Sequence, residues 1–547
     1  MRRHRIVAAA AVLAIMASAC GGKSSTNSST SSSPETTTAG SETTAATPAE
    51  TTTPAPEQDA TLKLAFTSDM DPPDPDTNYQ VQGSNVMGSV YEGLLEYAPD
   101  SSTEFKGLLA ESWTAAADGL SYTFKLRSGL TFADGTPLTS VELKAGFERR
   151  SNEAVKSPSS YMLLPVAGYE TPDPLTFIVK MKYPESAFLS YMASSFSPKA
   201  INPKVLADNA ADNAIEYLKT QSAGSGPYVI STFVLGQEYQ LTRNENYWGE
   251  KPYYAKVSIR IIPDAASQVV QLQGGDLDIL AGQPAATTST FEGSKDFQVV
   301  TFPVLRKAQL WVNTQAGPTA DPAFRAALRS AIDRASLVDQ VWGKYATVSK
   351  QMYPTGMIAD GLAADDWTFD PAPLSGLAAG KKITLAYPAD RPADQQAAEA
   401  LQTQLSATGL DVELVPTQDA DAYGWASDLS SAPNLYYRVP FPDSNHPDTW
   451  ARLFWYNNVA SGFGGFLNFL GSGTTAGDTA MDAGLPAVDD KVVAEKYDAA
   501  AKELHDQVGI ITLADVPDVF IAKAGITGFA HWLPMPLTLA LKVLRVG

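Results

Sequence analysis

Cysteine and histidine are nearly absent from this chain of 547 residues, which has one cysteine, Cys20, and four histidines. A single cysteine excludes an intramolecular disulfide and any Cys-x-x-Cys metal or redox motif. The histidines are spread along the chain, at His4, His446, His505 and His531. A site of several imidazole ligands cannot be assembled from neighbours in the sequence. We therefore expect no metal site and no cofactor.

Positive charge is also scarce, because 40 Lys and Arg side chains stand against 60 Asp and Glu side chains, which gives a formal net charge of −20. Nucleic acid and anionic lipid headgroups repel such a chain, and no basic patch with interleaved aromatic residues is present. We therefore expect no nucleic-acid partner. The patterns G-x-S-x-G and H-E-x-x-H and the P-loop are missing, so we do not expect an enzyme. A secreted hydrolase that uses two of the many carboxylates stays a remote alternative.

The N-terminus has the pattern of a secretion signal, which we place at residues 1–19. Three arginines precede an apolar run at residues 6–16, and small residues follow it. The run is too short to span a bilayer, which needs about 20 apolar residues. Ala17-Ser18-Ala19-Cys20 resembles the bacterial lipobox, which implies that Cys20 is lipid-modified and becomes the new N-terminus. An ordinary secreted protein with a chance cysteine is the alternative.

Residues 20–58 are dominated by Ser, Thr, Ala and Pro after the expected lipidated Cys20. They have few apolar side chains to bury, so we expect a disordered linker. Such a tether would hold a folded body away from the membrane surface. An O-glycosylated stalk would have the same geometry.

The body, from residue 59, alternates between strand and helix patterns and is long enough for two or three packed units. Apolar side chains at every second position predict strands. They are Leu62, Leu64 and Phe66; Tyr122, Phe124 and Leu126; Phe177, Val179 and Met181; and Val257, Ile259 and Ile261. A strand at 383–387, a helix at 393–406 and a strand at 412–414 have the spacing of a βαβ crossover. We therefore expect an α/β fold with a partly parallel sheet.

Two helix starts are marked by their capping residues. Thr139-Ser140-Val141-Glu142 predicts a capping box that opens a helix through Phe147. Asp321-Pro322 predicts an N-cap followed by the first helical residue. We expect the apolar residues after it to share one face of that helix, at Phe324, Leu328 and Ile332.

Six segments of the body, in one fixed order, resemble a known family. They are Val90 to Leu95; Leu109 to Trp113 with Thr123 to Arg127; Phe132 to Thr139; Gly224 to Tyr228 with Arg243 to Trp248; Gly275 to Ile279; and Asp321 to Asp333. The family is the bacterial extracellular solute-binding proteins of family 5, the oligopeptide, dipeptide and nickel group. The resemblance implies a two-lobed fold of the type II periplasmic-binding-protein kind, with three domains, mixed sheets and a hinge.

The family's domain plan can be carried over to this chain. It implies a discontinuous domain I at 59–98, 224–300 and 505–547. Domain II would cover 99–223 and domain III 301–504. In this plan a solute binds in the cleft between two lobes, and closure of the hinge buries it.

The resemblance also implies a function. The protein would capture a small solute, an oligopeptide or dipeptide first of all, and deliver it to an ABC importer. Since the chain has no ATP-binding motif, the permease and ATPase subunits would be other polypeptides. The protein would be a monomer on the outer face of the cytoplasmic membrane, held there only by its lipid. Nickel, heme, a sugar or glutathione are alternative solutes on the same scaffold.

One motif of the family concerns the solute itself. In peptide-binding members an aspartate of an Asp-x-x-x-Pro run takes the α-ammonium group, and Asp443 to Pro447 has that spacing. A buried ammonium group needs a carboxylate partner, because an unpaired charge in a closed cleft is costly. The alternative is that Asp443 only caps the following helix. Pro440 replaces the tryptophan that peptide binders have three residues before the aspartate, so the pocket is altered.

We expect six further residues to contribute to the solute site. Phe441, Tyr437 and Arg438 precede Asp443, and His446 follows it. Because an imidazole can bind a metal, His446 makes nickel or heme an alternative solute, which we rank below a peptide. Tyr161 and Trp311 lie near cleft-lining positions of the family, although burial in an ordinary core would explain both.

Overall fold

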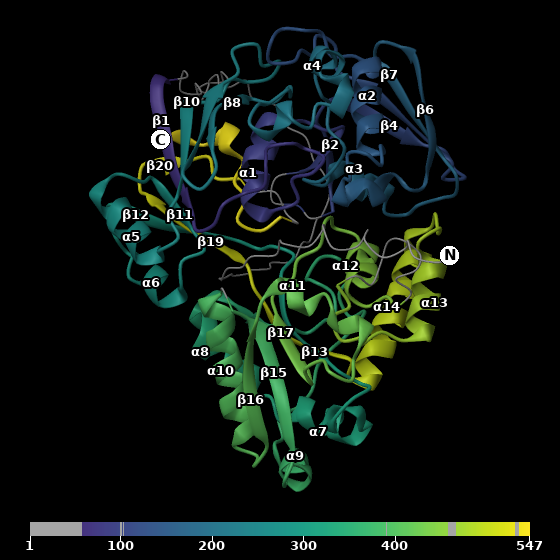
Figure 1. Ribbon diagram of the computed structural model, residues 1–547, viewed down its shortest axis with the longest axis vertical. Coiled ribbons are helices and arrows are strands. Elements are labelled where there is room, and N and C mark those ends of the chain that lie inside the picture. The colour runs from purple at the N-terminus through teal and green to yellow at the C-terminus, as the bar shows by residue number, and fades with distance from the viewer. Residues whose placement is uncertain (1–56, 99–100, 102, 390, 458–466, 531–534) are drawn as a thin grey trace, which may run out of the picture.

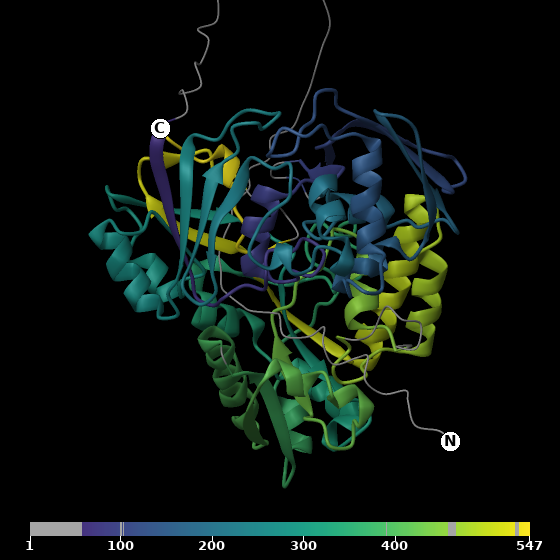
Figure 2. The same ribbon diagram turned by 45° about the horizontal axis from the view of Figure 1, so that its top comes forward.

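The chain folds into two lobes joined by two backbone crossings (Figure 1; Figure 2). The computed structural model describes residues 57–98, 101, 103–389, 391–457, 467–530 and 535–547. The expected signal peptide, Cys20 and nearly all of the expected linker lie outside the described residues. No helix in the described ranges is both long and apolar enough to cross a lipid bilayer.

The first lobe contains a seven-stranded mixed sheet. Its strands, in spatial order, are β12 (Phe297–Phe302), β19 (Asp518–Lys523), β11 (Ile279–Ala281), β1 (Glu57–Phe66), β10 (Tyr254–Ile261), β9 (Glu238–Arg243) and β8 (Tyr228–Val234). Strand β1 is parallel to β10 and β11, and the other neighbours are antiparallel. Three helices accompany this sheet, α1 (Val81–Val90), α5 (Ala265–Gly274) and α6 (Ala285–Ser289).

The first lobe also contains a smaller, four-stranded antiparallel sheet, drawn in blue in Figure 1. Its order is β4 (Ala110–Ala115), β5 (Ser121–Leu126), β7 (Thr176–Met181) and β6 (Val166–Asp173). The accompanying elements are the hairpin β2 (Leu95–Tyr97) and β3 (Phe105–Gly107), helices α2 (Ser140–Arg150), α3 (Phe188–Ala193) and α4 (Pro203–Asp208), and the 3-10 helix η1 (Pro158–Leu163).

The second lobe, at the bottom of Figure 1, is built on a six-stranded mixed sheet. Its order is β14 (Thr347–Val348), β18 (Ile510–Asp515), β13 (Lys307–Val312), β17 (Leu435–Arg438), β15 (Lys382–Pro388) and β16 (Asp411–Thr417). Its helices are α7 (Pro322–Ser330), α8 (Arg334–Trp342), α9 (Ala372–Leu377), α10 (Pro392–Ser406), α11 (Asp419–Ala422), α12 (Pro447–Phe454), α13 (Thr475–Gly484) and α14 (Asp490–Gln507).

The two crossings between the lobes lie side by side. The first, residues 303–306, connects β12 to β13, and the second, residues 516–517, connects β18 to β19. They are tied together, because the Val516 amide donates to the carbonyl of Arg306 at 3.1 Å and the Arg306 guanidinium lies 3.3 Å from the carboxylate of Asp518. The second crossing comes later than the expected boundary at 505, because β18 pairs with β13 and β14. The division into three domains stays a prediction.

Strand periodicity correctly places four strands of the first lobe. The four alternating patterns coincide with β1, β5, β7 and β10, and β15, α10 and β16 form the expected parallel unit. The mixed sheets confirm the predicted α/β class. The capping box at Thr139 is present, and α2 continues beyond Phe147 to Arg150.

Candidate functional site

Asp443 lies in the loop between β17 and α12, at the contact between the two lobes. The first residue of α12 is Pro447, and the N-cap is His446, whose Nδ1 accepts a hydrogen bond from the Asp448 amide at 3.1 Å. His446 therefore does the capping that the alternative hypothesis assigned to Asp443. The Asp443 side chain is free of that task, although the residue is only 2% exposed.

Three side chains of the first lobe reach Asp443. The phenol groups of Tyr79 and Tyr161 both donate to its Oδ2, Tyr161 at 2.5 Å. The hydroxyl of Ser194 donates to its backbone carbonyl at 2.5 Å. The carboxylate of Asp443 is thus held by two phenols of the first lobe, one from the loop before α1 and one from η1, and its backbone carbonyl is held by a residue at the end of α3.

The neighbouring backbone continues the contact between the lobes. The Asn445 amide donates to the phenol oxygen of Tyr97 at 2.9 Å, and Ser190 donates to the carbonyl of Asn445 at 3.2 Å. Further out, the Ser186 amide donates to the carbonyl of Leu485 at 2.8 Å. The lobes therefore meet through polar groups, in an arrangement that buries Asp443.

Burial controls the ionisation of this site. It raises the pKa of the Asp443 carboxyl to about 6, although the hydrogen bonds from Tyr161 and Tyr79 lower it. Burial, together with the charge of Asp443, also holds the pKa of both phenols well above their usual value. At neutral pH the phenols are therefore donors and Asp443 is an anion.

The second carboxylate oxygen of Asp443 is buried and has no hydrogen-bond partner among the described residues. The indole nitrogens of Trp311 and Trp450 are also buried without a hydrogen-bond partner among the described residues. Buried polar atoms of folded proteins nearly always have a partner, whether protein, water or ligand. The free Oδ1 therefore can accept a donor from a bound molecule, and an ammonium group is the donor that also balances its charge.

The structure places three of the predicted residues in one apolar cluster, which extends over both lobes. Phe441 and Tyr161 belong to the same apolar cluster as Trp311, which packs on Phe469 with ring centroids 5.4 Å apart. Arg438 is fully buried, donates to the Tyr436 phenol at 3.0 Å and lies 5.2 Å from the Phe469 ring centroid.

Tyr437 is not brought to the site. It lies on the opposite face of the six-stranded sheet, in the core with Leu310 and Ile511. Successive side chains of a strand point to opposite faces, so Tyr436 and Arg438 face the lobe contact while Tyr437 faces away. For this residue the ordinary core explains its position.

His446 is a buried helix cap. Burial lowers the pKa of its imidazole to about 3. The ring is therefore neutral, and its Nδ1 can accept a hydrogen bond from the Asp448 amide. Within the described part of the chain, no three histidine, cysteine, aspartate or glutamate side chains are grouped as metal ligands would be.

A cavity of about 500 Å³ lies elsewhere in the first lobe, between the β2–β3 hairpin and the C-terminal segment. Its lining includes Arg127, Trp248 and Arg545 and none of the residues predicted for the solute site. It is therefore separate from the contact around Asp443.

Two residues of the site were not predicted from the sequence, Tyr79 and Ser194. They lie 364 and 249 positions from Asp443 in the chain. Neither stands in a motif, and each comes from an irregular segment, at the end of the Asp-Pro-rich stretch before α1 or just after α3. No local pattern could have indicated them.

Comparisons with known proteins agree with this architecture. The family model for "Bacterial extracellular solute-binding proteins, family 5 Middle" matches residues 104–462. The "Probable D,D-dipeptide-binding periplasmic protein DdpA" of Escherichia coli (strain K12) is 29% identical over 336 residues, 59% of this chain. The "Glutathione-binding protein GsiB" of Shigella flexneri is 27% identical over 336 residues, 60% of this chain. The match spans 64% of the length of each of these relatives.

A solved structure shows the same fold. The periplasmic binding protein DppA of Helicobacter pylori, in complex with the peptide STSA, superposes with a TM-score of 0.75. It is 20% identical, and the match covers 89% of this chain and 98% of that one. The fold and the family match define an extracellular solute-binding protein of the type II periplasmic kind. This chain belongs to the bacterial extracellular solute-binding proteins of family 5.

Proposed function

We propose that the protein is the solute-binding component of an ABC importer and that its solute is a small peptide with a free amino terminus. One observation carries the choice of solute, the buried Asp443 with one oxygen held by two phenols and the other open to a donor. The relatives support the same class, because they include a protein named as D,D-dipeptide-binding and one named as glutathione-binding. The partner permease and ATPase would be separate subunits, and the protein would act as a monomer without catalysis.

The electrostatics of the site favour an ammonium group. A buried carboxylate that lacks a counter-ion is destabilising, and its raised pKa reports that cost. An ammonium group at Oδ1 would restore the balance of charge in a site closed to water. Breaking such a buried pair by removing one partner commonly costs about 2–5 kcal/mol.

Calorimetry on the wild type and on Asp443→Asn, each with free and N-acetylated peptides, tests this proposal. We expect either change alone to weaken binding about 30-fold to several thousand-fold, because each removes the same ion pair. Together they should cost little more than one alone, since the interaction can be lost only once.

Asp489→Asn is the matched control, because Asp489 is an N-cap of the same lobe and asparagine also caps well. It should leave peptide affinity unchanged. Wild-type binding that is insensitive to acetylation would exclude amine recognition and leave a non-peptide solute, such as nickel, heme or a sugar.

We further propose that Cys20 anchors the protein to the outer face of the membrane. The support is the sequence alone, a secretion signal that ends at the only cysteine of the chain. Cys20→Ser should release the protein into the medium or periplasm, because the thiol that receives the lipid is lost. Membrane fractionation of both forms measures this, and retention of the serine variant would rule the anchor out.

A further inference from the structure

Arg150, the last residue of α2, is at the centre of the segments that reach Asp443. Its side chain is completely buried. Its guanidinium donates to the carboxylate of Asp76 at 2.5 Å and to the carbonyl of Pro75 at 2.8 Å. It also donates to the hydroxyl of Ser159 at 2.7 Å and to the carbonyl of Phe196 at 2.6 Å. One side chain thus binds three separate segments of the first lobe.

Each of these segments supplies one donor to Asp443. Tyr79 follows Asp76 by three positions, and Tyr161 follows Ser159 by two. Ser194 is tied to the third segment, because its hydroxyl accepts the Phe196 amide at 3.0 Å. The ring of Phe196 also packs on the ring of Tyr79, with centroids 4.4 Å apart.

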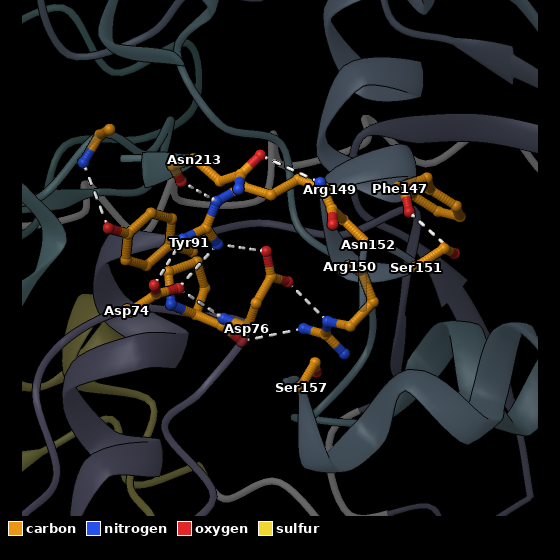
Figure 3. Close-up of polar contacts among 12 residues, drawn as sticks. Asp74, Asp76, Tyr91, Phe147, Arg149, Arg150, Ser151, Asn152, Ser157 and Asn213 are labelled. Carbon is orange, nitrogen blue, oxygen red and sulfur yellow. Dashed lines mark hydrogen bonds and ion pairs between the residues drawn. The ribbon is translucent and has the colours of Figure 1, made fainter. Parts of the chain in front are cut away.

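A second arginine completes a buried ion cluster, which we define as Asp74, Asp76, Arg149 and Arg150 (Figure 3). Arg149 donates to both carboxylates, to Asp74 at 2.5 and 2.8 Å and to Asp76 at 2.5 Å. Figure 3 shows the carboxyl group of Asp76 between the two guanidinium groups. All four side chains are at most 3% exposed.

The residues that make up the ion cluster favour a rigid arrangement of its side chains. Two positive and two negative charges balance, so no net charge is buried. The planar fork of arginine fixes the direction of each bond it makes, which a lysine ammonium does not. Such a cluster is rigid when every member has its partners.

We propose that Arg150 is a positioning residue for the contact between the lobes. It holds in register the three side chains that donate to Asp443, and the rest of the ion cluster holds its guanidinium in place. This inference deepens the proposed function, on which it rests for the role of Asp443. It can be tested without any solute, so the two can fail separately.

The test follows the titration of Asp443 in the solute-free full chain, by carbon NMR of labelled aspartate carboxyl groups. The Asp443 signal is assigned by its loss in Asp443→Asn. Tyr161→Phe should move the midpoint to higher pH, because one hydrogen bond that lowers this pKa is gone. Arg150→Lys should move it in the same direction, because the phenols lose their fixed places. Ser159→Ala, a milder change, removes one link from Arg150 without a change in charge.

The double variant Arg150→Lys with Tyr161→Phe gives the decisive comparison. If Arg150 acts through the phenols, the double variant should titrate close to the single variants. If the midpoint shift of the double variant equals the sum of the two single shifts, the proposal is overturned. It is also overturned if neither Arg150→Lys nor Ser159→Ala shifts the midpoint. Should Arg150→Lys fail to fold, Ser159→Ala combined with Tyr161→Phe gives the same comparison.

Arg334→Lys is the matched control. Arg334 is a buried arginine of the second lobe that donates to the carbonyl of Ser349 and to Asp366. Its substitution should lower thermal stability and leave the Asp443 midpoint where it is. A shift of that midpoint in the control would show that any loss of a buried arginine disturbs Asp443, and would overturn a specific role for Arg150.

Discussion

Asp443 is buried, yet only one of its two carboxylate oxygens has a hydrogen-bond partner among the described residues. Two phenols hold one of its oxygens, which offsets part of the cost of burial. The pKa of the carboxyl still rises to about 6, because burial is the larger effect. A cationic group of a solute would offset the part of the desolvation free energy of Asp443 that the two hydrogen bonds leave uncompensated.

Under the proposed function, this pKa gives peptide binding a defined dependence on pH. The ion pair requires an ionised Asp443, so affinity should fall as the pH drops through about 6, by up to tenfold per pH unit. It should also fall above about pH 8, where the α-amino group of a peptide loses its proton. Calorimetry across this range should therefore give a bell-shaped profile for the wild type.

The solute-free protein should show the opposite trend on the acid side. A carboxyl whose folded pKa lies above its unfolded value binds more protons when folded. The free energy of unfolding should therefore decrease as the pH rises from 3.8 to about 6, once other groups are subtracted through Asp443→Asn. A wild-type affinity that stays constant from pH 5 to pH 7 would contradict the ion pair.

At the residue scale, the sequence indicates only part of this site. Asp443 and Tyr161 could be proposed from a motif and a family resemblance, and the structure brings them together. Tyr79 could not, since its contact depends on how the lobes meet. The sequence also does not show that Tyr437 faces the core with Leu310 and Ile511, because the register of a strand decides which alternate residues face which side of the sheet.

At the scale of elements, periodicity and capping residues carry most of the information. The predicted helix after Asp321 is shorter than expected, because α7 ends at Ser330, before Ile332, and Asp333 caps a separate helix, α8. Phe324, Leu328 and Ile332 are nevertheless all buried in one core. Their spacing predicted the burial correctly, whereas the break depends on a second cap within the same apolar pattern.

The glycine at position 226 in the Gly224 to Tyr228 motif has a steric explanation, which is the close approach of this loop to the end of α1. A Cβ on Gly226 would lie 2.6 Å from the carbonyl carbon of Val90, the last residue of α1. The Gly226 amide also donates to the Val90 carbonyl at 2.9 Å. This loop and the end of α1 can approach so closely only because no side chain intervenes.

Gly226→Ala should therefore destabilise the fold, by about 1–3 kcal/mol, because backbone rather than a flexible side chain would have to move. Urea denaturation measures the change. Gly274→Ala is the control, because nothing lies within 4 Å of a Cβ there and the residue is in α5. It should stabilise the protein by about 0.5–1 kcal/mol. Equal stability of the two variants would refute the steric explanation.

At the scale of the whole molecule, two lobes with paired crossings predict a hinge motion. A solute can shift the population only if it binds the closed arrangement better than the open one. Without solute we expect the closed arrangement described above to exchange with an open one, so small-angle scattering should give a smaller radius of gyration with saturating peptide than without it. Asp443→Asn at the same peptide concentration should remain closer to the solute-free value. Identical wild-type profiles with and without peptide would argue against closure.

The tied crossings also determine where movement is small and where it is large. Pro440 is bonded to the start of β13, where its carbonyl accepts the Lys307 amide at 3.3 Å, so Asp443 lies only a few residues from the pivot. Leu485 is the C-cap of α13, which Figure 1 shows at the right-hand side of the molecule, away from β12 and β19. Rotation of the second lobe about the crossings would therefore move Asp443 less than it moves Leu485. We therefore expect a hinge motion about the crossings to separate Leu485 from Ser186, whose backbone groups meet at 2.8 Å, by more than it displaces Asp443.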